Sequence, residues 1–308
     1  RSQVFGYYDH NMMVMLEKTR DHIEKPLKFT PRQRLWYIRA KQVIISTGSI
    51  ERPLVFGNND RPGIMLASAA KEYIKIYGVL VGKNPIIFTN NDSAYDCAIE
   101  FKKNGINPIV LDVRNNSSGS VVTEAKNLNI KIKFSYGIVN TGGYLRVNKA
   151  KIGKLNDDKS DYENFENVKC DCICVSGNWT PTIHLSSQSG NKLKFNESIN
   201  AFIPDKSRQN EKTIGSASGT FTLKQSIDEG FKTGYELSKK ITGNDVKSSP
   251  PTINERSYKQ HDKFWCMPLP KNKHIKRFVD FQNDVAVSDI ELAVREGFRS
   301  IEHVKRYT

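Results

Sequence analysis

The sequence lacks any apolar run that approaches the roughly 20 residues needed to span a bilayer. Its first residues, RSQVFGYYDH, have no signal-peptide architecture, and both this start and the final EHVKRYT are interpreted as cut ends of a longer protein. We therefore expect no membrane partner. A length of 308 residues is typical of about two globular domains.

Acidic residues are fewer than basic ones. The 47 Lys and Arg exceed the 33 Asp and Glu and leave a net charge of +14. These basic residues are scattered in pairs among acidic ones, without the basic stripe and interleaved aromatics that a nucleic-acid groove uses. Nucleic acid is thus not an expected partner, whereas an anionic dinucleotide or an acidic partner subunit suits such a surface.

A disulfide framework is also missing. The five cysteines are an odd count, and their spacing fits reduced thiols in the cytoplasm. Cys170, Cys172 and Cys174 alternate, so a strand would place all three on one face, where free cysteine packs as a small apolar residue. Because ligands on one strand do not converge, we expect neither zinc nor an iron–sulfur cluster.

No nucleophile–base constellation is visible, so the catalytic residues stay unassigned. The six histidines are dispersed, without a metal-binding grouping, and each is interpreted as a surface or packing residue. His184, close to a predicted returning strand, is the only histidine that we select for a test.

The first half of the chain carries clear local patterns. Residues 1–50 are β-rich, with a predicted hairpin (QVFGYYD and MMVMLEKT), and a helix is predicted over 67–77 with its end at Gly78. Residues 85–133 then alternate strand and helix, which predicts a parallel βαβ sheet. The predicted segments are PIIFT, SAYDCAIEFKKNG, PIVLDV, SVVTEAKNL and KIKFS, followed by an antiparallel return over 136–175 (GIVN, YLRVNK and CDCICV) with a polar excursion at KLNDDKSDYENFEN.

The second half contains one long predicted helix, over 222–241. Its apolar or small positions include Gly230 and Gly234, which predict close packing against a sheet; the others are Leu223, Ile227, Phe231, Leu237 and Ile241. Residues 243–275 have the composition of a linker. In VSDIELAVREG, Ser288 and Glu291 predict a capping box and Gly297 predicts the helix end.

Two turns of small residues predict a nucleotide site. Thr47 and Gly48 end the apolar strand of VIISTGS, and Gly215 and Ser216 lie in IGSASGTF, which leads into the helix at 222–241. Small side chains let the backbone approach a ligand, and a helix N-terminus favours a pyrophosphate. We expect the two turns to meet around one ligand, although the usual G-x-G-x-x-G fingerprint is absent.

A third segment has the position of a dinucleotide site but not its glycines. TNNDSAY (Thr89–Tyr95) stands where the glycine turn would be, and Asp112 ends the next strand at the ribose position. Side chains would crowd the pyrophosphate there. The segment is interpreted as a structural sheet, with loss of ordinary nicotinamide binding in a Rossmann-type unit as the related alternative.

Several strings resemble the α subunit of heterotetrameric sarcosine oxidase. The resemblance covers nearly the whole chain, and FTNNDSAY and FVDFQND are its most specific parts. The longer strings are VIISTGSIERPLVFGNNDRPGIMLASA, IIFTNNDSAYDCA, VSGNWTPTIHLSSQSG and FVDFQNDVAVSDIELAVREGFRSIEHVKRYT. In opine and amino-acid dehydrogenases the segment matching FVDFQNDV carries cluster-binding cysteines. Here it has none, which favours sarcosine oxidase.

The resemblance implies a fold and a division of the chain. The fold class would be α/β, a partial two-dinucleotide-domain flavoprotein (glutathione-reductase-like) fold with a small helical C-terminal segment. Residues 1–80 plus 176–242 would form the NAD-binding domain, interrupted by a degenerate Rossmann-like domain at 84–175. Residues 243–275 would be a linker, and 276–308 a module related to iron–sulfur-binding ones.

The resemblance also implies chemistry and partners. NAD would contact Val4, Ser216, Phe221 and Leu223, with Gly48 and Gly215 lining the approach. FAD and FMN would be held mainly through a β subunit, with γ and δ subunits completing the complex and tetrahydrofolate in a C-terminal domain. The reaction would convert sarcosine to glycine and hydrogen peroxide, with formaldehyde or methylenetetrahydrofolate. An opine, hydrogen-cyanide-forming or amino-acid dehydrogenase α subunit, or a non-catalytic NAD-holding scaffold, are the alternatives.

Overall fold

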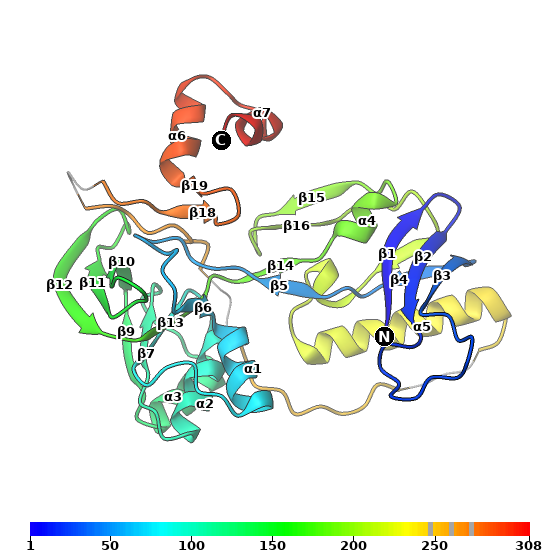
Figure 1. Cartoon of the computed structure of the whole chain (residues 1–308), viewed down its shortest axis with the longest axis horizontal. Helices are drawn as coiled ribbons and strands as arrows, with labels where there is room; N and C mark the ends of the chain where they lie inside the picture. The colour runs from blue at the N-terminus through cyan, green and yellow to red at the C-terminus, as the bar shows by residue number, and fades with distance from the viewer. Residues whose placement is uncertain (246–248, 259–261, 271–273) are drawn as a thin grey trace. The chain divides into compact units, whose positions relative to one another are not determined.

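The computed structural model describes residues 1–245, 249–258, 262–270 and 274–308. The chain forms two compact units (Figure 1): residues 1–50 with 179–255, and residues 51–178 with 256–308. Residues 51–80, grouped with the first domain in the sequence analysis, pack here with the second unit. Within the described ranges, no helix has the length and apolar character needed to cross a membrane.

The first unit contains small sheets and one long helix. The predicted hairpin is confirmed, since β1 and β2 pair antiparallel and β3 extends their sheet. A separate parallel pair joins β4 to β17, and β15 pairs antiparallel with β16. The elements are β1 (Ser2–Tyr8), β2 (Met12–Lys18), β3 (Gln33–Arg39), β4 (Val43–Ile45), β5 (Ser49–Glu51, where the two units divide), β14 (Trp179–Pro181), α4 (His184–Gln188), β15 (Leu193–Asn196), β16 (Ala201–Pro204), β17 (Glu211–Thr213), the short 3₁₀ helix η2 (Gly215–Ser218) and α5 (Leu223–Thr242).

Helix α5 forms where its apolar periodicity predicts it. Thr222 caps its start by accepting the Gln225 N–H, and Gly243 ends it in the left-handed conformation. The expected close packing of Gly230 and Gly234 is wrong. A β-carbon added at either glycine would meet nothing within 4 Å, so neither glycine touches a sheet.

The second unit is built on a five-stranded parallel sheet in the order β6-β13-β7-β8-β9. Strands β7 and β13 are buried at every position, as expected for a parallel sheet covered on both faces. The predicted βαβ alternation is confirmed, and α1 ends at Gly78 as expected. The elements are β6 (Ile64–Leu66), α1 (Ala67–Tyr77), β7 (Pro85–Thr89), η1 (Asp92–Ala94), α2 (Tyr95–Lys103), β8 (Ile109–Asp112), α3 (Ser120–Asn127), β9 (Lys131–Phe134) and β13 (Cys172–Ser176).

Each face of this sheet has its own core. One core packs sheet residues such as Ile87 and Val110 against α1, α2 and α3, which Figure 1 shows grouped together. The other packs Ile86 and Phe88 against the antiparallel sheet β10-β11-β12. These last strands are β10 (Tyr136–Gly142), β11 (Lys149–Leu155) and β12 (Tyr162–Lys169).

The expected antiparallel return over 136–175 is partly wrong. CDCICV enters the parallel sheet as β13, between β6 and β7, because its apolar side chains fill both cores there. Most of YLRVNK is a connection before β11, and the polar excursion contains β12. The three cysteines are buried, but not on one face: Cys172 and Cys174 lie in the helix-side core, whereas Cys170 precedes β13 and lies in the other.

The last segment of the second unit carries β18 (Phe278–Asp280), β19 (Val285–Ala286), α6 (Val287–Arg295) and α7 (Ile301–Tyr307). The capping box at Ser288 is wrong, because α6 begins earlier and Asp289 accepts the Ala286 N–H at 2.8 Å. Within the predicted linker, Met267 is fully buried in the second unit's core. Residues 246–248, 259–261 and 271–273 of that linker lie outside the described residues.

Candidate functional site

The two predicted turns meet at the carboxyl edge of the β4–β17 pair. The strands run parallel, and the Ile214 N–H donates to the Ile45 carbonyl at 2.9 Å. Gly48 follows β4 and Gly215 follows β17, both at positive φ, where glycine is favoured. A β-carbon added at Gly48 would meet only the Ser216 Oγ, at 3.9 Å. The geometry therefore brings the backbone of one turn beside the other and leaves it open to close approach.

Side chains from the same unit fix these turns. The Gly215 N–H donates to Glu229 Oε2 of α5 at 2.9 Å, and Ser218 Oγ contacts the other oxygen of that carboxylate at 3.4 Å. On the strand side, Thr47 Oγ1 donates to the Thr182 carbonyl at 2.7 Å, and the Thr182 N–H donates to the Gly48 carbonyl at 2.9 Å. Glu229 was not found from the sequence, because it lies 14 residues beyond the turn that it holds.

The N-terminus of α5 already binds an anion from the chain itself. The carboxylate of Glu255 accepts the Leu223 N–H at 2.5 Å and the Lys224 N–H at 3.1 Å. A carboxylate is favoured there because the first amide groups of a helix lack intrahelical acceptors and carry the positive end of its dipole. The pyrophosphate predicted here from the sequence would have to replace Glu255 at the same donors.

The remaining predicted residues are less closely grouped. Phe221 is half-buried just before α5, and Leu223 is exposed on its first turn. Val4 lies in a different sheet, in β1, where the pairing with β2 shifts register between Val4 and Gly6. His184 is exposed at the start of α4.

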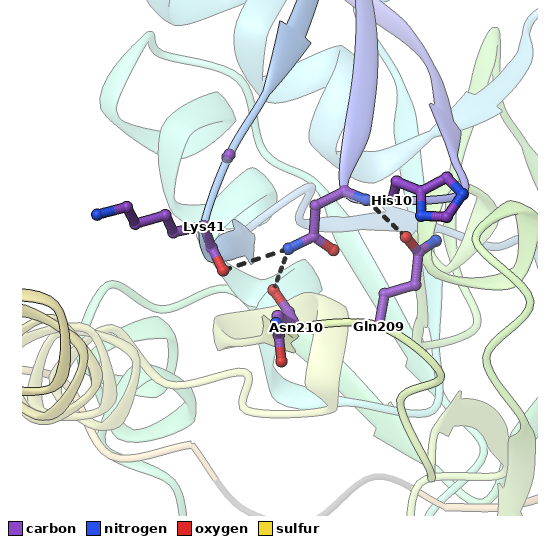
Figure 2. Close-up of a pocket in the computed structure, with 6 residues that line it drawn as sticks. His10, Lys41, Gln209 and Asn210 are labelled. Carbon is purple, nitrogen blue, oxygen red and sulfur yellow. Dashed lines mark hydrogen bonds between the residues drawn. The ribbon is translucent and has the colours of Figure 1, made fainter.

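A polar pocket in the first unit lies at the opposite edge of the parallel pair (Figure 2). It has a volume of about 360 Å³ and is lined by Ala40 and Lys41 before β4, Gln209 and Asn210 before β17, and His10 and Asn11 in the turn between β1 and β2. Asn11 ties the segments together by donating to the Gln209 side chain at 2.7 Å and to the Asn210 carbonyl at 3.1 Å. Ligands of open α/β sheets bind at the carboxyl ends of the strands. We therefore assign this pocket a structural role.

The corresponding carboxyl edge of the second unit is filled by its own side chains. Arg114 contacts Asp92 at 2.8 Å and Asp112 at 2.7 Å, and Tyr95 donates to Asp112 at 2.8 Å. All four residues are buried. Burial raises the pKa of Asp112, and the hydrogen bonds and charge of Arg114 oppose that rise. A β-carbon added at Gly119 would come within 2.1 Å of Asp92, so little space is left.

This network occupies the place where a dinucleotide unit has its glycine turn and ribose-binding acid. Asp92 belongs to TNNDSAY, and Asp112 ends β8 as predicted. The sequence indicated crowding but not its cause. The one available signal was an arginine two positions after the strand-ending acid, in DVR. Asp92 could not be assigned as its second partner without the fold.

In the described ranges, no cluster of three or more His, Cys, Asp or Glu residues could hold a metal ion. Cys172 and Cys174 lie with their sulfur atoms 3.6 Å apart in the helix-side core. Burial raises the pKa of Cys170 to about 12, so this thiol is a poor candidate for reactive chemistry.

Sequence comparison identifies relatives of the chain over its whole length. Over its whole length the chain is 32% identical, across 317 residues, to the sarcosine oxidase subunit alpha of Corynebacterium sp. (strain P-1). It is 31% identical, across 312 residues, to that of Rhizobium meliloti (strain 1021). The chain is a homologue of the sarcosine oxidase α subunit. It spans about a third of the length of these relatives, 32% and 30% respectively.

Two further comparisons concern the C-terminal segment and the fold. The family model for the sarcosine oxidase A3 domain matches residues 274–308, the segment that contains α6 and α7. Among solved structures, the L-proline dehydrogenase of P. horikoshii is similar with a TM-score of 0.62 and 16% identity, over 100% of this chain and 54% of that one. The thioredoxin reductase of T. acidophilum is similar with a TM-score of 0.55 and 16% identity, over 78% and 73%. The predicted α/β flavoprotein fold class is therefore confirmed.

Proposed function

We propose that the first unit holds NAD between the turns at Thr47–Gly48 and Gly215–Ser216. The observation that carries this proposal is the juxtaposition of Gly48 and Ser216 at the carboxyl edge of β4 and β17. An anionic dinucleotide fits here because small residues at positive φ expose the backbone to close approach. Phe221, Leu223 and Val4 would be the outer contacts. The Glu229 carboxylate would keep the turn in place from the side of α5.

We further propose that the chain works as part of a sarcosine oxidase α subunit. The homologues carry that name, although the chain spans only about a third of them. The complete complex would demethylate sarcosine to glycine, with hydrogen peroxide and either formaldehyde or methylenetetrahydrofolate as the other products. FAD and FMN would supply the redox chemistry, mainly through a β subunit, with γ and δ subunits and a tetrahydrofolate-binding domain completing the assembly. Five cysteines in free form suit a cytoplasmic protein.

The second unit is proposed to bind no dinucleotide. A pyrophosphate at the carboxyl ends of β7 and β8 would have to displace Asp92 and Asp112 from Arg114. Like charge would oppose a pyrophosphate next to two carboxylates, and the site has no glycine-lined opening. The unit would thus serve as a degenerate Rossmann-like scaffold, which is the structural interpretation favoured from the sequence.

The substitution Ser216→Trp tests the NAD site. The indole would fill the space beside Gly48, so the purified protein, with its co-purifying subunits, should bind NAD at least about tenfold more weakly, a loss of about 1.4 kcal/mol, and should retain less NAD through purification. The measurement is the NAD that acid releases per folded protein. Ser187→Trp, on an exposed position of α4, is the matched control and should keep its NAD. Equal NAD in the Ser216 variant and the wild type would contradict the site.

A second variant separates the two parts of that site. If the pyrophosphate uses the N-terminus of α5, Glu255→Ala removes a competing carboxylate and should strengthen NAD binding several-fold, the scale of 0.3–1 kcal/mol that one anion at a helix end contributes. Unchanged affinity would limit the site to the backbone around Gly48 and Gly215.

A further inference from the structure

Residues 255–258 form a strap whose first residue caps helix α5 from outside the helix. The Glu255 carboxylate accepts the Leu223 N–H at 2.5 Å and the Lys224 N–H at 3.1 Å. Both amide groups belong to the first turn of α5, where the backbone N–H groups have no acceptor within the helix. Protection of these two amide groups from solvent therefore depends on Glu255.

The next residues of the strap lie on the second unit. Arg256 pairs with Asp96 of α2 at 2.6 Å and with Glu124 of α3 at 2.8 Å. The Ser257 carbonyl accepts the Ser120 N–H at 3.1 Å, and the Ser257 N–H donates to Ser120 Oγ at 2.8 Å. Two successive residues are thus held on α2 and α3, one through its side chain and the other mainly through its backbone.

The two sets of contacts are joined by one peptide bond, between Glu255 and Arg256. The first unit ends at this bond and the second unit resumes there. Consecutive Cα atoms are about 3.8 Å apart, so fixing one of the two residues restricts the positions of the other. A group that is tethered in this way has a high effective concentration at its target. The Glu255 carboxylate should therefore occupy the α5 amide groups more fully while Arg256 is held by its two carboxylates.

We propose that this strap is a latch that regulates nucleotide binding at the start of α5. In the latched state Glu255 occupies the first amide groups of the helix, and Arg256 holds the strap on α2 and α3. The pyrophosphate of NAD would take the same amide groups and release Glu255. Because both groups are anions that use the same donors, the two states exclude each other. This inference rests on the NAD site proposed above and adds a control of that site by contacts in the other unit.

The latch predicts a linkage that an ordinary helix cap does not. Weakening the contacts of Arg256 should strengthen NAD binding, although those contacts are made on α2 and α3. Because coupling between two sites is reciprocal, bound NAD should in turn loosen the strap on the second unit. Faster exchange of the Ser120 amide, which donates to the Ser257 carbonyl, would report that loosening.

The first experiment follows residue-resolved hydrogen exchange in the purified protein, with its co-purifying subunits, after removal of NAD. Arg256→Ala should speed exchange of the Leu223 and Lys224 amides several-fold, toward the rates in Glu255→Ala. The Gln225 amide is the internal control and should not change, because the N-cap side chain of α5 accepts it rather than the strap. Unchanged exchange at Leu223 and Lys224 in the Arg256 variant would overturn the latch.

The second experiment measures NAD affinity in the same variants. Glu255→Ala and Arg256→Ala should each tighten NAD binding about two- to fivefold, the range expected for one anion at a helix end. The double variant should bind no more tightly than Glu255→Ala alone, since both changes act through one carboxylate. Lys103→Ala is the matched control, because Lys103 also approaches Glu124, at 3.9 Å, without belonging to the strap. It should leave both the exchange and the affinity unchanged.

Failure of the latch and failure of the NAD site give different results. If Ser216→Trp weakens NAD binding but neither Glu255→Ala nor Arg256→Ala strengthens it, the site stands and the latch is overturned. Additive gains in the double variant would also overturn the latch, because they would show two independent effects. If Ser216→Trp has no effect, the NAD site is wrong, and faster exchange in the Arg256 variant would then show a cap on α5 that does not regulate NAD, which overturns the latch as well.

Discussion

Both units contain parallel strands whose carboxyl ends stand where an α/β protein binds ligands, but the two edges differ. In the second unit, Asp92, Asp112 and Arg114 fill the edge with buried ion pairs, and the sheet is covered on both faces. In the first unit, Gly48 and Ser216 leave the edge open, and Ile44 leaves one face partly bare. The same kind of sheet edge is therefore filled by side chains in one unit and left open in the other.

The two units differ in which groups satisfy the polar groups at their strand ends. Where side chains fill the edge, buried charges need partners from the chain itself, and Arg114 supplies them for two carboxylates. Where a ligand is expected, backbone groups stay accessible and side chains remain small. The two units should thus respond in opposite ways to similar substitutions.

The largest expected effect is that of Arg114→Ala. It leaves Asp92 and Asp112 buried without their cation, which should lower the free energy of unfolding of the second unit by about 3–5 kcal/mol. Hydrogen exchange of peptides from β7 and β8 in urea measures the unfolding of that unit separately from the first. Arg256→Ala breaks the more exposed contacts to Asp96 and Glu124 and should cost about 1 kcal/mol or less. Similar losses in the free energy of unfolding for both variants would contradict the conclusion that buried ion pairs fill the carboxyl edge of the second unit.

A pair of glycine substitutions sharpens the same comparison. At Gly57 in the second unit, a β-carbon would come within 2.3 Å of the Val139 carbonyl, so Gly57→Ala should cost about 1–3 kcal/mol. Gly234→Ala in α5 meets no neighbour and restricts the unfolded chain, so it should stabilise the helix by about 0.5–1 kcal/mol. Urea unfolding with exchange detection gives both values. A destabilised Gly234 variant would show that the α5 surface is already packed.

A further expected effect depends on pH and compares two buried carboxylates. Asp112 has a cation beside it, whereas the described donors to Glu211 are the neutral Asn191 and Ser207. Burial raises the pKa of Glu211. The folded state then holds its proton to a higher pH than the unfolded state, so stability falls as pH rises from the unfolded pKa through the folded one.

Glu211→Gln should therefore unfold at a higher urea concentration than the wild type at pH 7.5, by about 1 kcal/mol, the usual scale for one buried polar group. The advantage should shrink as the pH is lowered through the folded pKa, where the wild-type carboxyl becomes neutral. Urea midpoints at several pH values measure it. An advantage that grows toward low pH would have the wrong sign and would exclude desolvation as the cause.

Much of the fold could be predicted because its signals are local. The apolar run PIIFT, the helical spacing of 67–77 and the stop at Gly78 each report on neighbouring residues, and the structure has these elements at the expected bounds. The two turns at Gly48 and Gly215 could also be selected, since small residues at a strand end are visible in the sequence. Their juxtaposition follows from parallel pairing of β4 with β17.

Other features depended on contacts between distant segments. The place of β13 between β6 and β7 joins residues more than eighty positions apart, and no local period distinguishes that central strand from an antiparallel one. The partner of Arg114 beyond Asp112 is Asp92, in a different loop. Glu255 reaches the start of α5 from more than thirty positions away.

The sequence by itself determined the βαβ order, the small-residue turns and the amphipathic character of α5, because each depends on the chemistry of nearby residues. Only the tertiary structure decided that α5 turns its polar side inward and that the second unit closes its carboxyl edge with Arg114. Burial and ion pairing are set by which segments meet in space. A helix shows in its sequence which side is apolar, but not whether another segment is present to cover that side.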